Sequence, residues 1–230
     1  MIYRRDRYVV SEELLTVIRK HLSLAFDVGD QRKIAEAQFQ LGFALLWYGA
    51  LDEAESALQQ ALRSAEGSSH QYYLTLCLTY LTIVYRKKGS LEKTRDYLTK
   101  SIAAARNRQM SGYVATAKAN QAWLDWRAGD LEAAESHGRQ ALEGWGQVAF
   151  VFSFQWTALW LLMAVAAEKG QLEQAIQYAG ELLAPEQQAL PQAVTVTMEQ
   201  AIHNWQNEQP EAARQKLVRA LVLAEEINQL

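Results

Sequence analysis

Turn-forming residues are scarce in this sequence of 230 residues, which contains 12 glycines and 3 prolines. Proteins average about 7% glycine and 5% proline, so both counts are low. Alanine, leucine, glutamate and glutamine fill the long segments between glycines. These residues favour helices because they lose little rotamer freedom there. Half of the residues are hydrophobic, which argues against disorder. The composition therefore predicts an all-α protein.

Excess positive charge and long apolar runs are also missing. The net charge is −3, whereas a nucleic-acid-binding surface needs clustered Lys and Arg, so we expect no nucleic-acid partner. Arg4, Arg5 and Arg7 are interpreted as part of a solvated N-terminal tail over residues 1–10. The N-terminus has no apolar run typical of a signal peptide, and the longest apolar stretch (158–167) is about half a membrane span. We therefore expect no membrane contact and a cytoplasmic protein.

Catalytic and metal-binding signatures are absent too. The single Cys77 cannot form an internal disulfide, which fits a reducing compartment, and its apolar neighbours favour a buried structural thiol. The chain contains no Gly-rich phosphate loop followed by Lys and no Gly-x-Ser-x-Gly motif. The four histidines are scattered without metal-ligand spacing. We expect no enzyme activity, no metal and no cofactor.

What the sequence does contain is an internal repeat of about 40 residues. A short motif starts at Gly49, Gly89, Gly129 and Gly170, and a weaker copy starts at Glu208. Successive starts are 40, 40, 41 and 38 residues apart. In the four glycine copies a leucine follows two residues later and an acidic residue three residues later. This register is very unlikely to arise by chance and predicts repeated structural units.

Each unit is predicted to be a helix, a tight turn at glycine and a second helix. Glycine suits the residue just past a helix end because it adopts positive φ without strain. The acidic residue that follows meets the positive end of the next helix dipole, and Pro210 suits the first turn of the last helix. Small residues flank most turns and permit close helix packing, although Met163 in the fourth unit predicts a more open pair. The expected helix pairs cover residues 33–66, 72–106, 113–147, 154–184 and 193–228.

Residues 11–29 are predicted to form one more helix, with Ser11 as its N-cap and Gly29 as its stop. This helix looks like the second half of a preceding, truncated repeat. We therefore expect a single repeat domain over residues 11–230, which is either a piece cut from a longer protein, the alternative we favour, or a naturally capped array.

The repeat pattern resembles the tetratricopeptide repeat family, which combines a small residue before the turn, glycine at the turn, and alanines five and twelve residues later. The resemblance covers roughly residues 33–228, but the period exceeds the usual 34 and the family's tryptophan near the start of the first helix is missing. Residues 28–42 and 211–226 look most like the C-terminal repeat region of large bacterial signalling ATPases and transcription activators. The resemblance implies a right-handed superhelical array of about five antiparallel helix pairs plus an N-terminal helix. It also implies a protein- or peptide-binding module of a bacterial regulatory protein.

The concave surface of such an array is lined, in this family, by one face of each first helix. Aromatic residues and arginine dominate binding hot spots, so they are the candidates on that face. An apolar peptide with an acidic flank would suit the rings and the cations. Carried onto this sequence, the candidate binding residues are Phe39, Phe43, Trp47, Tyr80, Arg86, Lys87, Asn120, Trp123, Trp126, Arg127 and Trp160.

The same tryptophans also fit a helix core, and the sequence leaves both interpretations open. In the third and fifth units, polar residues replace the apolar stripe of the other first helices. Buried amides and carboxylates are costly unless hydrogen-bonded. Either these groups form a satisfied network, or the helices are rotated and the polar stripe faces the groove. The residues concerned are Gln121, Asp125, Gln200 and Asn204.

Two alternative functions stay open beside peptide binding. Asn120, Gln121 and Asp125 next to tryptophan rings are what a sugar-sensing site would need. The phenylalanine-rich segment 149–156 would favour a self-associating scaffold if exposed, or cap the junction of the third and fourth units if buried. An effector domain elsewhere in the full-length chain and a homo-oligomer are further partners that the sequence leaves open.

Overall fold

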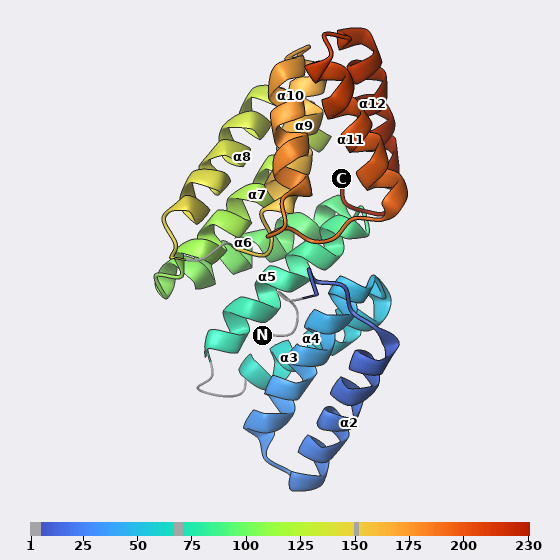
Figure 1. Ribbon diagram of the computed structural model, residues 1–230. Helices are drawn as coiled ribbons and strands as arrows, with labels where there is room; N and C mark the ends of the chain where they lie inside the picture. The colour runs from blue at the N-terminus through green and yellow to red at the C-terminus, as the bar shows by residue number, and fades with distance from the viewer. Residues whose placement is uncertain (1–5, 67–70, 150–151) are drawn as a thin grey trace. The chain divides into compact units, whose positions relative to one another are not determined.

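The computed structural model of the protein describes residues 6–66, 71–149 and 152–230 (Figure 1). Within those ranges it contains eleven α-helices and no β-strand. Consecutive helices pack in pairs, which confirms the predicted all-α helical repeat array. The chain divides into two compact units, Met1–Met110 and Ser111–Leu230, where the sequence led us to expect one domain.

Unit 1 holds the N-terminal helix and the first two helix pairs. Its helices are α2 (Glu12–Val28), α3 (Gln31–Tyr48), α4 (Leu51–Glu66), α5 (Gln71–Lys87) and α6 (Leu91–Asn107). α3 packs against α4 and α5 against α6 within the pairs, while α4 also packs against α5 and joins one pair to the next. α2 packs on α3 through a small core of Ala25, Ile34 and Ala37.

Unit 2 holds the other three pairs. Its helices are α7 (Ser111–Arg127), α8 (Leu131–Gly146), α9 (Trp156–Glu168), α10 (Leu172–Leu183), α11 (Gln192–Gln206) and α12 (Pro210–Glu226). Ala122, Ala134, Leu161 and Val165 form a core cluster between the third and fourth pairs. α9 is buried along nearly its whole length, and it contacts α7, α8, α10 and α12. This helix is therefore the centre of the packing of unit 2.

The turns explain why the repeat register is so regular. Gly49, Gly89, Gly129 and Gly170 all adopt left-handed φ, between 69° and 96°. Glu208 takes the same conformation at the fifth turn, with φ 56°, although it carries a side chain. A left-handed residue other than glycine is strained, so the weak fifth copy keeps the geometry of the turn at some cost in stability. The observed helix bounds lie within two residues of those predicted for the five pairs.

The ends of α2 also follow the prediction. Ser11 Oγ accepts a hydrogen bond from the backbone N–H of Leu14 at 3.3 Å, as an N-cap does. Gly29 ends the helix with φ 73°, and its N–H donates to the carbonyls of Ala25 and Phe26. The helix therefore begins and ends where its capping residues require.

Close approach of the helices in a pair depends on small residues. A Cβ placed on Gly42 would lie 2.6 Å from Leu58 Cγ, so α3 and α4 can approach this closely only with glycine there. Met163, which was expected to open the fourth pair, is completely buried in unit 2. Its pair compensates in sequence, because Ala179 stands in the register position that Leu58 holds in the first pair. The first pair thus combines glycine with leucine at these two positions, and the fourth pair combines methionine with alanine.

The same ionic contact joins successive pairs in both units. In unit 1, Lys88 Nζ lies 2.6 Å from Asp52 and 2.5 Å from Glu55. In unit 2, Lys169 Nζ lies 2.5 Å from Glu132 and 2.7 Å from Glu135. In each case the lysine directly precedes a turn glycine, and the carboxylates stand three and six residues after the preceding turn glycine. We call each set an inter-repeat triad.

Residues 6–10 do not behave as the predicted solvated tail. Tyr8 and Val10 are buried, and Tyr8 stacks on Trp47 with ring centroids 4.5 Å apart. Arg7 and Tyr8 both adopt left-handed φ, 47° and 59°, to turn the chain onto α3. The stretch is thus part of unit 1; Arg4 and Arg5 lie outside the described residues.

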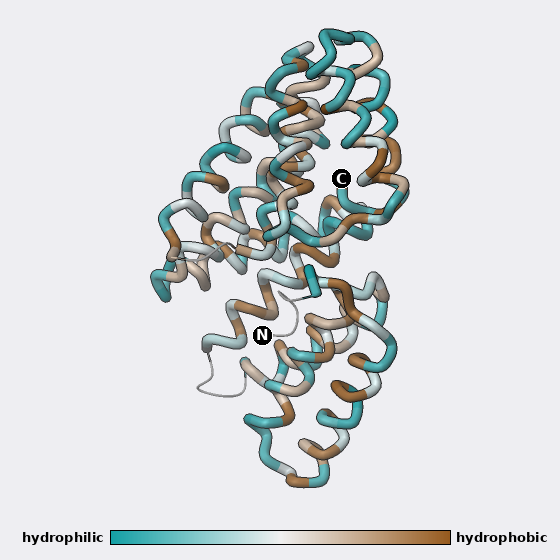
Figure 2. The backbone as a smooth tube through the Cα atoms, viewed as in Figure 1, coloured by the Kyte–Doolittle hydropathy of each residue, from teal (hydrophilic) through white to brown (hydrophobic). Residues whose placement is uncertain are grey.

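Hydrophobic and hydrophilic residues alternate around most helices, as packed amphipathic helices require (Figure 2). Across the described parts of the chain, no helix combines the length and apolar character needed to span a membrane.

Candidate functional site

Five aromatic rings lie close together on α3 and α5, the first helices of the two pairs in unit 1, and four of them belong to the predicted binding residues. On α3, Phe39, Phe43 and Trp47 are spaced by four residues, so their rings lie along one helix face, 6.1 Å and 6.0 Å apart. Tyr80 of α5 lies 5.6 Å from Phe39 and 5.2 Å from Phe43, and Tyr73 lies 5.5 Å from Phe39. These distances are those of favourable aromatic pairs. We call this group the aromatic cluster of unit 1.

The aromatic cluster is deep at one end and open at the other. Trp47 and Tyr80 are buried, with 7% and 6% of their surface exposed, and Tyr8 covers Trp47. Phe39, Phe43 and Tyr73 are partly exposed. The cluster therefore offers apolar ring surface to a partner on its Phe39 side.

Two cations follow the cluster on α5. Arg86 has only 2% of its surface exposed, and burial lowers its pKa to about 9. Lys87 is partly exposed, and burial of its ammonium, together with the charge of Arg86, lowers its pKa to about 7. An anionic group beside them would favour their charged forms and raise both pKa values. This end of α5 is thus suited to a carboxylate.

The predicted residues of unit 2 are mostly buried. Asn120, Trp123 and Trp160 have no exposed surface, which favours the core interpretation for both tryptophans. The guanidinium of Arg127, which is exposed, lies 5.6 Å from the centre of the Trp123 ring. Trp126 is partly exposed and donates its indole N–H to Glu168 at 2.7 Å. Only Trp126 and Arg127 of this group reach the surface.

The polar stripe of the third repeat is a satisfied network. Gln121 Nε2 donates to Asp125 at 2.7 Å, and the other oxygen of Asp125 lies 2.7 Å from His137 Nδ1 on α8. Asn120 Nδ2 donates to the carbonyl of Thr116 at 2.9 Å, whereas its buried Oδ1 has no hydrogen-bond partner among the described residues. Each of the three side chains that a sugar site would use thus has at least one internal partner, and Gln121 and Asp125 favour the network over the sugar site. In the fifth repeat Gln200 is exposed and Asn204 partly exposed, so that stripe needs no such network.

The phenylalanine-rich segment caps the third pair. Phe152 and Phe154 are buried, while Phe150 lies outside the described residues. Phe152 stacks on Trp145, with ring centroids 6.0 Å apart, and a Cβ on Gly112 would lie only 2.6 Å from its ring. Trp145 in turn donates its N–H to the carbonyl of Gly112 at 2.9 Å. The buried rings favour the capping role over a self-association patch.

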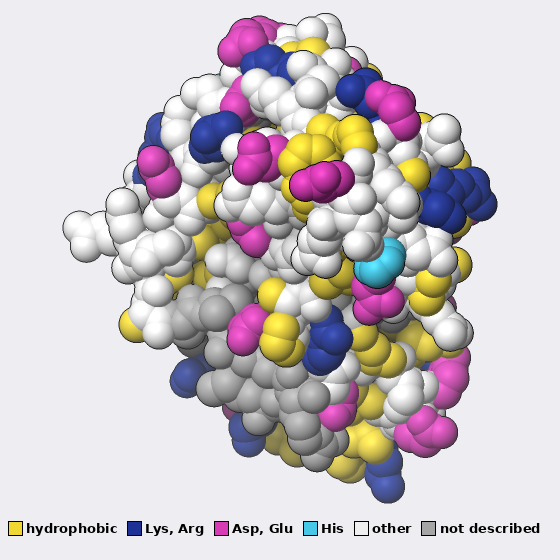
Figure 3. All heavy atoms as spheres, turned by 45° about the horizontal axis from the view of Figure 1, so that its top comes forward, with side chains coloured by type: hydrophobic (Ala, Val, Ile, Leu, Met, Phe, Trp, Pro, Cys, Tyr) yellow, Lys and Arg dark blue, Asp and Glu magenta, His cyan; other side chains and the backbone are white. Residues whose placement is uncertain are grey.

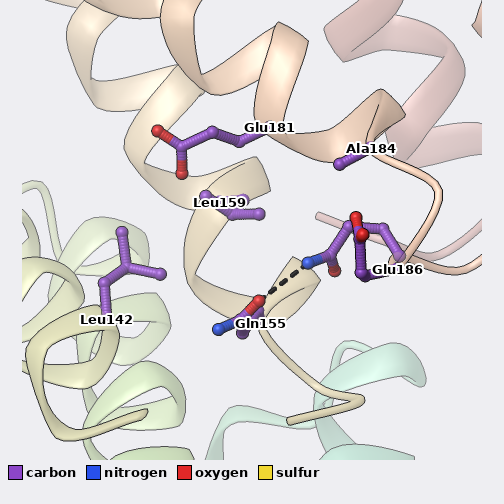
Figure 4. Close-up of a pocket in the computed structure, with 7 residues that line it drawn as sticks. Leu142, Gln155, Leu159, Glu181, Ala184 and Glu186 are labelled. Atoms are coloured by element: carbon purple, nitrogen blue, oxygen red, sulfur yellow. Dashed lines mark hydrogen bonds between the residues drawn. The ribbon is translucent and has the colours of Figure 1, made fainter. Parts of the chain in front are cut away.

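A cavity of about 370 Å³ in unit 2 was not found from the sequence (Figure 4). Leu142, Gln155, Leu159, Glu181, Ala184, Glu186 and Gln187 line it. These residues come from α8, α9, α10 and the connection after α10, so no short motif contains them. The repeat register does carry a signal, because Glu181 is acidic at a position where the other repeats hold glutamine, lysine or arginine.

Other features of the described residues give no competing site. Cys77 is buried, and burial raises its pKa to about 12, so the thiol stays protonated at neutral pH. No three His, Cys, Asp or Glu side chains in the described ranges are grouped to hold a metal ion. On the face drawn in Figure 3, apart from its grey residues, acidic and basic side chains are interspersed and no patch of one sign stands out.

Comparison with known proteins adds no assignment: no protein-family model matches the chain, and no curated protein matches it either.

Proposed function

We propose that this chain is a protein- or peptide-binding repeat module, of the tetratricopeptide kind that its sequence resembles, and that it binds through the aromatic cluster of unit 1. The observation that carries the proposal is the aromatic cluster, whose rings are partly exposed on the Phe39 side. We place the module in the cytoplasm, as a non-catalytic regulatory region of a bacterial signalling or transcription-regulatory protein.

The chemistry of the partner follows from the two ends of the site. Phe39, Phe43 and Tyr73 offer ring surface that buries an apolar or aromatic side chain at low entropic cost. Lys87, which is partly exposed at the far end of α5, supplies the cation against which we place an acidic residue of the partner. The expected partner is a segment with apolar residues followed by an acidic residue.

Selection of displayed random peptides against the purified chain tests the proposal. We expect enriched peptides that combine aromatic or leucine residues with an acidic residue. Binding of one such peptide, followed by fluorescence anisotropy, should weaken roughly 30-fold on Phe39→Ala, the effect of losing a hot-spot ring of about 2 kcal/mol.

Phe26→Ala is the matched control, because Phe26 lies on α2 outside the cluster and is 53% exposed. It should leave affinity unchanged. Failure to enrich any peptide family, or an equal loss from Phe26→Ala and Phe39→Ala, would contradict the proposal. Circular dichroism of both variants shows whether folding is retained.

A further inference from the structure

Two glutamates and two amide side chains line the cavity of unit 2. Glu181 projects from α10 on the side of Leu142 and Leu159, and Glu186 projects from the connection that follows α10 (Figure 4). Gln187, which is only 6% exposed, donates its amide N–H to Gln155 Oε1 at 2.8 Å. Leu142 and Leu159 supply an apolar side. The volume of about 370 Å³ is within the range of small-ligand sites.

The repeat register shows that Glu181 is unusual. In the first repeat, the residue eleven after the turn glycine is Gln60, and it is hydrogen-bonded to Gln38, eleven before that glycine, at 3.5 Å. In the third repeat, Gln140 accepts a hydrogen bond from Lys118 at the same two positions. These polar contacts link the two helices of a pair.

The fourth repeat lacks that link. Its two positions hold Leu159 and Glu181, and a leucine cannot hydrogen-bond a carboxylate. Glu181 accepts one hydrogen bond, from Gln177 on its own helix at 3.2 Å. In the second and fifth repeats the position eleven residues after the turn residue holds Lys100 and Arg219, and each forms an ion pair on its own helix.

The two carboxylates of the cavity are not neutralised by the described part of the chain. Neither Glu181 nor Glu186 forms an ion pair with a described residue. By contrast, the partly buried Glu55 and Glu135 each contact two cationic side chains. Arg139, one turn before Leu142 on α8, is held by Glu135 at 2.7 Å. The cavity therefore keeps its negative charge and attracts cations.

We infer that this cavity binds an alkyl-ammonium or alkyl-guanidinium group, with the cation at the carboxylate of Glu181 and its aliphatic stem against Leu142 and Leu159. Carboxylates give the strongest hydrogen bonds to such cations, and the oxygen of Gln155 offers a further acceptor. The apolar side selects an alkyl cation over a hydrated inorganic ion. The group belongs either to a free amine or to a lysine or arginine side chain of a partner.

Isothermal titration calorimetry of the full chain tests this inference. The probes are agmatine and cadaverine as free cations, and the N-acetyl methylamides of arginine and lysine as side-chain analogues, with glutarate as the anionic control. We expect the cations to bind and glutarate not to bind. Tighter binding of the amides indicates a partner's side chain, and tighter binding of the free amines indicates a metabolite; both support the cationic site.

Glu181→Gln should weaken binding about tenfold, the effect of losing one charged hydrogen bond, and Glu186→Gln should weaken it less. Glu173→Gln is the matched control, because Glu173 is exposed on the same helix, does not line the cavity and changes the net charge equally. Absence of heat with all four cations, or equal weakening by Glu173→Gln, overturns the inference. The result is independent of the aromatic cluster, so failure of one site is distinguishable from failure of the other.

Discussion

The two units share their framework contacts but not the faces of their first helices. Both contain an inter-repeat triad at identical register positions, Lys88 with Asp52 and Glu55 in unit 1, and Lys169 with two glutamates in unit 2. The side chains that connect the pairs therefore recur about every 80 residues along the chain. Framework positions repeat because they serve packing, so function is better sought where the units differ.

The residues at the register positions of the triad are different where the chain divides into its two units. Before the third turn glycine stands Ala128, and the corresponding positions of the second repeat hold Glu92 and Arg95. The missing lysine and the arginine in place of a carboxylate rule out a triad there, and unit 2 begins at Ser111. The fifth repeat, with Asn207 before its turn, lacks the triad as well, yet stays within unit 2. Apolar packing of α12 on α9 therefore suffices without the ions.

The units differ most in their tryptophans. Unit 1 contains only Trp47, whereas the six others lie in unit 2. Trp145 stands sixteen residues after its turn glycine, where the first and second repeats have the buried Ala65 and Ala105. In unit 2 the larger side chain donates its N–H to the carbonyl of Gly112 and stacks on Phe152, whose ring occupies the space beside Gly112. The same register thus supports two different cores.

Trp145→Ala should lower the stability of unit 2 more than the other substitutions in that unit. Removing a fully buried tryptophan costs about 3–5 kcal/mol, and here it also leaves the carbonyl of Gly112 without its donor. Urea unfolding followed by circular dichroism measures the loss. Trp126→Ala is the control, since Trp126 is partly exposed, and it should cost clearly less. A similar loss from both variants would mean that Trp145 is not a core residue.

Glycine-to-alanine substitutions test the close contacts of each unit. Gly42→Ala in unit 1 and Gly112→Ala in unit 2 would each bring a Cβ to 2.6 Å from a packed side chain, Leu58 or Phe152. We expect a loss of about 1–3 kcal/mol for each, despite the better helix propensity of alanine. Gly180→Ala on α10 meets no atom within 4 Å and should stabilise by up to about 1 kcal/mol. Thermal unfolding should therefore move in opposite directions, and a uniform gain would disprove the steric argument.

Local rules made the repeat predictable from sequence. A turn glycine must adopt left-handed φ, and leucine, acid and alanine then follow at fixed helical spacing, so Gly49 and its equivalents locate every pair. The satisfied network of Asp125 was also one of the two alternatives that its polarity allowed. Such features depend on residues that are close in sequence or related by the repeat.

Features that depend on which side chain fills which space were not predictable. Nothing near Tyr8 in sequence indicates that it stacks on Trp47, because the contact joins segments 39 residues apart. Spacing alone also left Trp123 and Trp160 undecided between groove and core, since both use the same helix face. The cavity beside Glu181 required three helices to be assembled.

The triads should contribute equally in the two units if their register equivalence is energetic as well as geometric. Glu55→Gln and Glu135→Gln should each lower stability by about 1 kcal/mol or less, as is usual for partly exposed ion pairs. Glu92→Gln, at the junction without a triad, should have no effect. Unequal losses from the first two variants would show that the neighbouring Tyr85 or Arg139 contributes more than the shared lysine.

Low pH should reduce the stability losses caused by Glu55→Gln and Glu135→Gln. Burial raises the pKa of Glu55, but hydrogen bonds from Lys88, Tyr85 and Lys93 outweigh it and hold the pKa below its usual value. The hydrogen bond from Lys169, against burial and with help from Arg139, does the same for Glu135. A depressed pKa in the folded state stabilises above the unfolded value of about 4.3 and is lost as pH falls through the folded value. Unfolding should therefore show a larger difference from the unchanged chain at pH 7 than at pH 3.

Lys87 gives the smallest expected effect on stability, and its first test is chemical labelling of the unchanged chain. Burial and the charge of Arg86 lower its pKa to about 7, whereas a hydrogen bond to Asp96 raises the pKa of Lys100. Only neutral amines react with acylating reagents, so mass spectrometry should show labelling of Lys87 half-maximal near pH 7 and labelling of Lys100 still rising above pH 10. The unfolded state binds more protons between about pH 7 and 10, so Lys87 should also make stability rise with pH over that interval. Arg86→Met should raise the pKa of Lys87 and move its labelling toward that of Lys100; unchanged labelling would mean that Arg86 does not act on it.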